Sequence, residues 1–226
     1  MKIAILAAMD KEMALLENIV DNSREWEAEG LRCLSGRVGG HEVLLAKCGI
    51  GKVNAALNTY RVIRSFSPDL VINSGVAGGA GELGIGALLV ADAVVYHDVW
   101  CGPGTEPGAP DGFDRFMLPS RRVIETARTH LTDPRPHFGL IATGDSFISK
   151  AEEIARIHAM FPDAAAVDME SAAIAQTCLC CGVEFAIIRV VSDTPGRGEN
   201  ISQYKDFWTK APEATFRAVA QILHHL

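Results

Sequence analysis

Short apolar runs alternate with segments of helical periodicity along most of this chain. Strands are expected over residues 2–8, 70–73, 88–96, 138–143, 164–168 and 184–192. Helices are expected near 13–20 and 53–63, over 118–131, 150–160 and 169–181, and from about 204 onward. Two further runs flank Gly39-Gly40 and predict a hairpin. This order predicts an α/β fold: a single domain, 1–226, with three α/β/α layers and a central mixed, largely parallel β-sheet.

Composition excludes several classes of function. The chain has a net charge of −7 and no cluster of Lys and Arg, so we expect no nucleic-acid partner. No apolar segment approaches the length of a membrane span, and the apolar start is too short for a signal peptide. The six cysteines lack the paired spacing of a zinc site and are expected to be reduced thiols. We therefore expect a cytoplasmic protein with no metal, no cofactor and no membrane partner.

A glycine-rich tract, Ser74–Gly79, follows the expected strand 70–73. Glycine lets a backbone approach a ligand closely, although a tight connection after a strand explains the tract equally well. The tract lacks the Lys-Ser/Thr ending of a phosphate loop and the spacing of a dinucleotide fingerprint. It therefore gives no support for binding of a nucleoside triphosphate or NAD.

Three acidic residues lie where expected strands end: Glu12, Glu170 and Asp193. Ligands of such sheets bind outside the carboxyl ends of the strands, so we expect these residues to share one site. Each has a simpler explanation. Glu170 would suit the start of a helix, and Asp193 would suit a helix or turn cap. Alternatively, the paired oxygens of Glu170 are suited to accept hydrogen bonds from two neighbouring hydroxyls.

Two other side chains invite a functional interpretation. Arg189 lies inside the apolar strand 184–192, and a buried arginine needs a carboxylate partner. We expect that partner to be Glu12 or Glu170. Phe147 is interpreted either as a core residue or as a stacking platform for a flat ring.

Seven segments, in chain order, resemble the motifs of the methylthioadenosine/S-adenosylhomocysteine nucleosidases of the nucleoside phosphorylase fold. The segments are Ala7-Ala8-Met9-x-x-Glu12, Cys48-Gly49-Ile50-Gly51-Lys52-Val53, Asn73-Ser74-Gly75-Val76-Ala77-Gly78-Gly79, Tyr96-His97-Asp98, Gly144-Asp145-x-Phe147-Ile148, Val167-Asp168-Met169-Glu170 and Arg189-x-x-Ser192-Asp193. Seven ordered matches are far more specific than any one of them, and they extend over nearly the whole chain.

The resemblance implies a role for each matching residue. Asp193, placed by Ser192, would protonate N7 of an adenine, while Phe147 would stack on the purine and the backbone of Ile148 would read its edge. Met169 and Glu170 would hold the ribose, and Glu12, supported by Arg189, would activate the attacking water. The remaining substrate-binding positions implied are Met9, Ile50, Val76, Ala77, Gly78 and Val167. No cofactor is implied, and the partners are an adenine nucleoside and a second copy in a homodimer.

The chain departs from the family pattern at two motifs and in one loop. Val76 stands where the common motif has serine, and Gly86-Ala87 replaces the usual Gly-Asp. The loop 100–110 is also unusual. The resemblance therefore does not fix which 5′ substituent is preferred, and 5′-deoxyadenosine is included among the candidate substrates. A purine nucleoside phosphorylase is one alternative, although Glu12 in the first loop would repel phosphate. A nucleoside-binding protein without chemistry is the other.

Overall fold

The structure, a computed structural model, describes residues 1–197, 200–210 and 213–226, and it has a mixed sheet at its centre. The described strands lie in the order β2-β3-β4-β1-β5-β8-β7-β6-β9. Their bounds are Lys2–Ala7 (β1), Asp21–Ala28 (β2), Leu31–Val38 (β3), His41–Lys47 (β4), Leu70–Gly79 (β5), Leu88–Tyr96 (β6), His137–Thr143 (β7), Ala164–Asp168 (β8) and Glu184–Asp193 (β9). The predicted mixed α/β architecture is confirmed.

Parallel pairs form the middle of this sheet. β1 pairs in parallel with β4 and β5, β5 with β9, and β7 with both β6 and β8. Antiparallel pairs join β2, β3 and β4 at one end, and β5 to β8 and β6 to β9 at the other. Because β5 pairs with both β8 and β9, the strands β5, β8, β7, β6 and β9 close on themselves.

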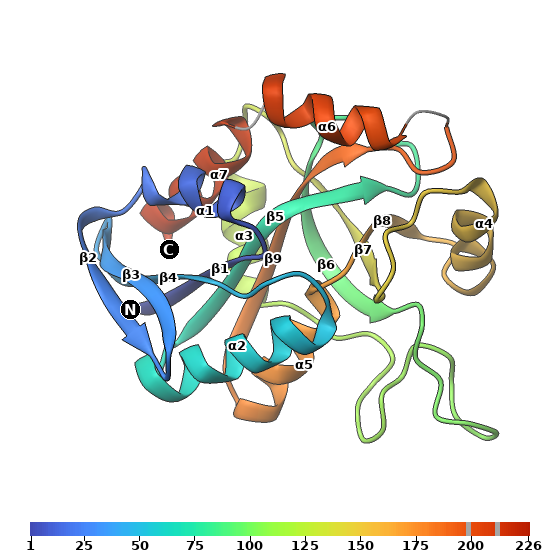
Figure 1. The fold of residues 1–226 in the computed structure, drawn as a ribbon, viewed down its shortest axis with the longest axis horizontal. Coiled ribbons are helices and arrows are strands. Elements are labelled where there is room, and N and C mark those ends of the chain that lie inside the picture. The colour runs from blue at the N-terminus through green and yellow to red at the C-terminus, as the bar shows by residue number, and fades with distance from the viewer. Residues whose placement is uncertain (198–199, 211–212) are drawn as a thin grey trace.

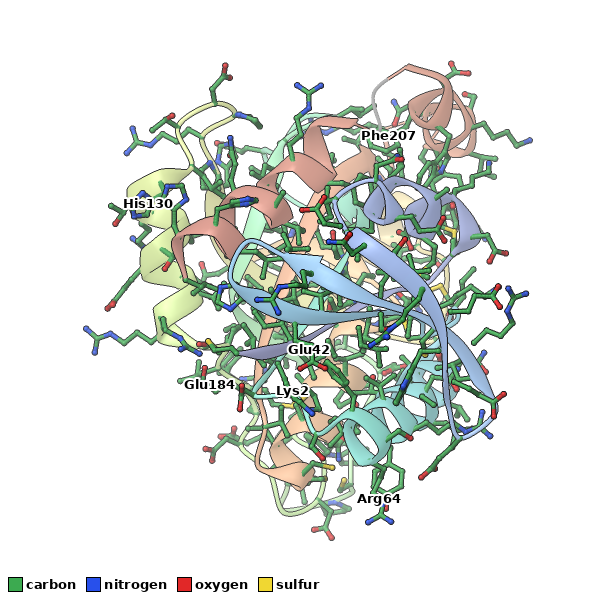
Figure 2. The ribbon with its side chains drawn as sticks, turned by 90° about the vertical axis from the view of Figure 1, so that its left-hand side faces the viewer. Lys2, Glu42, Arg64, His130, Glu184 and Phe207 are labelled. Atoms are coloured by element: carbon green, nitrogen blue, oxygen red, sulfur yellow. The ribbon has the colours of Figure 1, made fainter. Side chains whose placement is uncertain are left out.

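Helices cover both faces of the sheet (Figure 1). On one face, α2 (Lys52–Phe66) and α5 (Ser171–Cys181) pack on each other and bury Val62, Phe66 and Ile174 against the strands. On the other face, α1 (Asp10–Glu17), α3 (Arg121–His130) and α7 (Glu213–His225) enclose a second core. α4 (Ala151–Met160) packs beside β7 and β8, and α6 (Asn200–Lys210) follows β9. Charged helix residues such as Arg64 point outward in the side view (Figure 2).

Three local features differ from the sequence-based expectation. The tract Ser74–Gly79 was expected to leave the strand, but it continues β5 to Gly79 because its backbone pairs with β9 and β8. β2 was not expected; its side chains are mostly exposed, so it has no apolar alternation. Among the described strands it pairs with β3 alone, at the edge of the sheet. The single expected C-terminal helix is two helices, α6 and α7.

Candidate active site

A cleft of about 610 Å³, including its mouth, opens where the central strands end. It receives residues from the loop between β1 and α1, the turn before α2, the end of β5, the loop after β7, the segment between β8 and α5, and the end of β9. Its lining comprises Ala8, Met9, Glu12, Ile50, Val76, Ala77, Gly78, Ser146, Phe147, Ile148, Val167, Asp168, Met169, Glu170, Ser192, Asp193 and Tyr204. All predicted site residues lie in this lining except Arg189.

The carboxylate of Glu12 is held by main-chain amides. Oε2 accepts hydrogen bonds from the backbone nitrogens of Ala8 at 2.8 Å and Met9 at 3.0 Å, and Oε1 accepts one from Val76 at 3.1 Å. Burial raises the pKa of Glu12, although nearby Arg189 and these amides act in the opposite direction. The result is a rigid buried carboxyl group with a raised affinity for a proton.

Gly75 leaves the space that Glu12 occupies. A Cβ built on Gly75 would lie 2.6 Å from Oε1 of Glu12, far inside van der Waals contact. Gly75 is in β5, where its backbone pairs with Arg189 of β9. The glycine is therefore required by close approach of a side chain to the strand.

Glu170 lies immediately before α5 and points back across the cleft to the start of α2. Its Oε1 accepts a hydrogen bond from the backbone nitrogen of Gly51 at 3.0 Å. Burial, and then the neighbouring Asp168, raise the pKa of Glu170 to about 7, while Arg189 and the Gly51 amide lower it. Glu170 is therefore a carboxyl group that can change protonation near neutral pH.

The carboxylate partner of Arg189 is Asp168, so the prediction that it would be Glu12 or Glu170 is wrong. Nε of Arg189 donates to Oδ2 of Asp168 at 3.0 Å, and Nη2 lies 2.9 Å from the same oxygen. Both side chains are almost completely buried, and Asp168 is also part of the cleft lining. Arg189 does not line the cleft, and it meets Asp168 because β5 pairs both with β8, which carries Asp168, and with β9, which carries Arg189.

Polar neighbours complete this buried pair. Nη2 of Arg189 also donates to the Asn73 side chain and to Oγ of Ser171, the latter at 2.9 Å. Asp168 accepts from Oγ1 of Thr143 at 2.6 Å and from the Ser171 hydroxyl. Such a fully bonded network offsets the cost of burying charge and orients the segment that carries Glu170.

Asp193 ends β9 and is buried. Its Oδ1 accepts a hydrogen bond from Oγ of Ser192 at 2.7 Å, and Nδ2 of Asn200 lies 3.4 Å from Oδ2. Burial raises the pKa of Asp193, with these two hydrogen bonds opposing the shift. Asp193 is thus the third cleft carboxyl group with a raised pKa.

Phe147 forms part of an aromatic wall and is not a core residue, since 48% of its surface is exposed. Its ring meets that of Tyr204 edge to face, with centroids 5.8 Å apart. The hydroxyl of Tyr204 contacts Sδ of Met9 at 3.3 Å. This wall adds apolar surface to a cleft that also carries carboxyl groups.

The chain is similar to known proteins in sequence and in fold. The sequence model of the Phosphorylase superfamily matches residues 2–224. The 5′-methylthioadenosine/S-adenosylhomocysteine nucleosidase of Anoxybacillus flavithermus is 40% identical over 219 residues, 93% of each chain. This chain belongs to the 5′-methylthioadenosine/S-adenosylhomocysteine nucleosidase family.

Solved structures of the nucleosidase family superpose on the whole chain. The Streptococcus pyogenes S-adenosylhomocysteine nucleosidase in complex with 5-methylthiotubericidin has a TM-score of 0.95 at 32% identity, covering 100% of this chain and 97% of that one. The Neisseria meningitidis nucleosidase in complex with methylthio-immucillin-A has a TM-score of 0.94 at 33% identity, covering 100% and 99%.

Four lining residues of this nucleosidase-family cleft were missed in the sequence: Ala8, Ser146, Asp168 and Tyr204. The first three lie inside motifs that carried the family resemblance, so their segments signalled the site although no role was assigned to them. Tyr204 lies on α6, eleven positions after Asp193, and no local pattern marks it. The same holds for Asn200, which contacts Asp193 from the start of α6.

The described part of the chain contains neither a candidate metal site nor a candidate membrane span. Among those residues, no group of three or more His, Cys, Asp and Glu side chains could hold a metal ion. No helix there is both long and apolar enough to cross a bilayer. The cysteines of the described residues are all free thiols.

Proposed function

We propose that this protein hydrolyses the N-glycosidic bond of 5′-methylthioadenosine and S-adenosylhomocysteine, releasing adenine and the 5-substituted ribose. The observation that carries the proposal is the charge of the cleft. Glu12, Glu170 and Asp193 line it together, and none of its described lining residues is Lys, Arg or His. A nucleoside that develops positive charge on its sugar suits such a site, whereas a phosphate ion does not.

Asp193 acts as the general acid on the purine. As the bond between C1′ and N9 breaks, its electron pair moves to the adenine, and Asp193 gives a proton to N7. The raised pKa of Asp193 supports this role because it keeps the carboxyl group protonated to a higher pH than usual. The hydroxyl of Ser192 holds Oδ1 and Nδ2 of Asn200 approaches Oδ2 at 3.4 Å, so both contacts orient the carboxyl group toward the cleft that it lines.

Glu12 acts on the water and the sugar. The water oxygen bonds to C1′, and the water proton passes to Glu12, whose raised pKa favours its acceptance. The negative charge of Glu12 also stabilises the cationic sugar before attack. Three backbone amides already hold the carboxylate of Glu12 in one orientation, so the side chain does not have to be ordered during the reaction.

The other lining residues bind the nucleoside. Glu170 accepts hydrogen bonds from the ribose hydroxyls, beside Met169, and Phe147 stacks on the purine. The backbone of Ile148 reads the purine edge. Met9 and Ile50 line the sugar and the 5′ substituent, and Val76, Ala77, Gly78 and Val167 complete the lining.

Turnover with and without phosphate tests the proposal. Purified protein should release adenine from 5′-methylthioadenosine in phosphate-free buffer, with 5-methylthioribose as the sugar product. Added phosphate should leave the rate unchanged and should yield no sugar 1-phosphate. Strict dependence on phosphate would make the protein a phosphorylase, and binding without any product would make it a nucleoside-binding protein.

We also propose that the protein is a homodimer in the cytoplasm. Apolar side chains project from α2 into solvent, including Val53, which is 76% exposed, and Leu57 and Tyr60. Trp100 is exposed in the adjoining loop, so a second copy has an apolar face to cover. Free thiols suit a reducing compartment. A monomeric mass by light scattering at micromolar concentration would contradict the dimer.

A further inference from the structure

A closed set of hydrogen bonds lies beside the cleft and joins three segments that are distant in sequence. Nζ of Lys52 pairs with both carboxylate oxygens of Asp98 at 2.8 Å. Oδ2 of Asp98 accepts from the backbone nitrogen of Asp145 at 2.9 Å, and Oδ1 of Asp145 accepts from the backbone nitrogen of Lys52 at 2.8 Å. The start of α2, the residue pair after β6 and the loop after β7 are thereby tied together.

This set reaches the cleft through one peptide bond. Gly51 precedes Lys52, and its amide donates to Glu170 at 3.0 Å. Gly51 has a φ of +90°, a conformation that glycine adopts readily, and glycine restrains the backbone less than any other residue does. Asp145 supplies a restraining contact on the next amide, and its own segment continues into Ser146 and Phe147 of the cleft.

A purely stabilising role is the simpler explanation. The Lys52 and Asp98 side chains are 22% and 30% exposed, and ion pairs near the surface contribute little to stability. That explanation does not account for the bond from the Lys52 amide to Asp145, which lies one residue from the amide that Glu170 contacts. A stabilising pair would also affect all substrates alike, whether or not they carry a 2′-hydroxyl.

We propose that Asp145 is a positioning residue for Glu170. By accepting a hydrogen bond from the Lys52 amide, its carboxylate fixes the turn at Gly51, and the Gly51 amide then aims Glu170 at the ribose hydroxyls. The inference rests on the proposed nucleosidase activity. It adds a residue outside the cleft lining that sets how strongly the enzyme selects a ribose.

The test compares 5′-methylthioadenosine with its 2′-deoxy analogue in Asp145→Ala and Asp145→Asn. Asp145→Ala removes the acceptor of the Lys52 amide, so kcat/KM for the ribonucleoside should fall about 10-fold, as for loss of a charge-assisted hydrogen bond. For the 2′-deoxy analogue, kcat/KM should fall less than about 2-fold. Asp145→Asn keeps an acceptor oxygen and should retain about a third or more of the ribonucleoside activity. Glu125→Gln, which removes the exposed Arg121–Glu125 pair on α3, is the matched control and should change neither value.

A double-mutant cycle with Glu170→Ala locates the effect. If Asp145 acts through Glu170, Asp145→Ala should have little further effect in the Glu170→Ala background. Equal losses on both nucleosides, an additive cycle, or unchanged kinetics in Asp145→Ala would each overturn the positioning role while leaving the nucleosidase intact. A wild-type protein that releases no adenine would overturn the proposed function itself, and the inference with it.

Discussion

Substituting alanine for Gly75 tests the proposed water-activating site at its tightest contact. The new Cβ would lie 2.6 Å from Oε1 of Glu12, and ordinary contact begins near 3.4 Å. The carboxylate must therefore move by about 0.8 Å. The displaced Oε1 is the atom that accepts the hydrogen bond from the Val76 amide at 3.1 Å, so this bond is disturbed as well.

The expected loss follows from the displacement. A misplacement of about 1 Å in a reacting group costs on the order of 10²-fold in rate, so kcat/KM of Gly75→Ala should fall about 10²-fold. The fall should appear mainly in kcat, because Glu12 acts on the water and the cationic sugar more than on the bound nucleoside. Adenine release measured by a coupled absorbance assay, with substrate saturation curves, separates kcat from KM.

A matched substitution controls for the added methyl group itself. Gly40, in the turn between β3 and β4, has open space around its Cβ position and no positive φ, so Gly40→Ala should keep wild-type kinetics. Thermal melting of both variants should show that each is folded. A Gly75→Ala enzyme within about 3-fold of wild type would refute the reasoning, because Glu12 would then tolerate the displacement that the geometry requires.

Three further predictions concern the buried charges. Asp193→Asn keeps the shape of the side chain but cannot give up a proton, so kcat should fall by about 10²–10⁴-fold while adenine still binds by calorimetry; a near-wild-type rate would exclude the general-acid role. Arg189→Met leaves Asp168 buried without its partner and should lower the free energy of unfolding by about 3–5 kcal/mol, with partial recovery in Arg189→Met/Asp168→Asn. Burial raises the pKa of Glu170 from its ordinary value of 4.5 to about 7, so ionisation of Glu170 destabilises the folded state. The stability that protonated Glu170 contributes below pH 4.5 is therefore lost as the pH rises through 7. Glu170→Gln should therefore gain stability over wild type between pH 4.5 and pH 8, by up to about 3 kcal/mol in urea denaturation, and a constant difference would argue against the raised pKa.

The order of strands and helices could be predicted from the sequence because periodicity is a local property. The run that precedes Asp168 reads as a buried strand, and the segment after Glu170 reads as a helix, with no knowledge of what either contacts. The same argument brought Glu12, Glu170 and Asp193 to one site, since strand ends of a largely parallel sheet lie along one edge. β2 escaped prediction because an exposed edge strand carries no apolar alternation.

Only the tertiary structure decided which groups meet. Arg189 needed a buried carboxylate, and the sequence offered several; strand order placed Asp168 against it. The amides that hold Glu12 come from residues as far apart as Ala8 and Val76, and the position of Tyr204 depends on how α6 returns over the cleft. Periodicity indicates which face of a helix or strand is apolar. Hydrogen-bond partners depend instead on strand register and helix docking, which join residues 60 or more positions apart in sequence, as Glu12 and Val76 are. The sequence thus determines which chemical groups the cleft contains. The packing of the elements determines which partners those groups meet, and therefore how their pKa values shift.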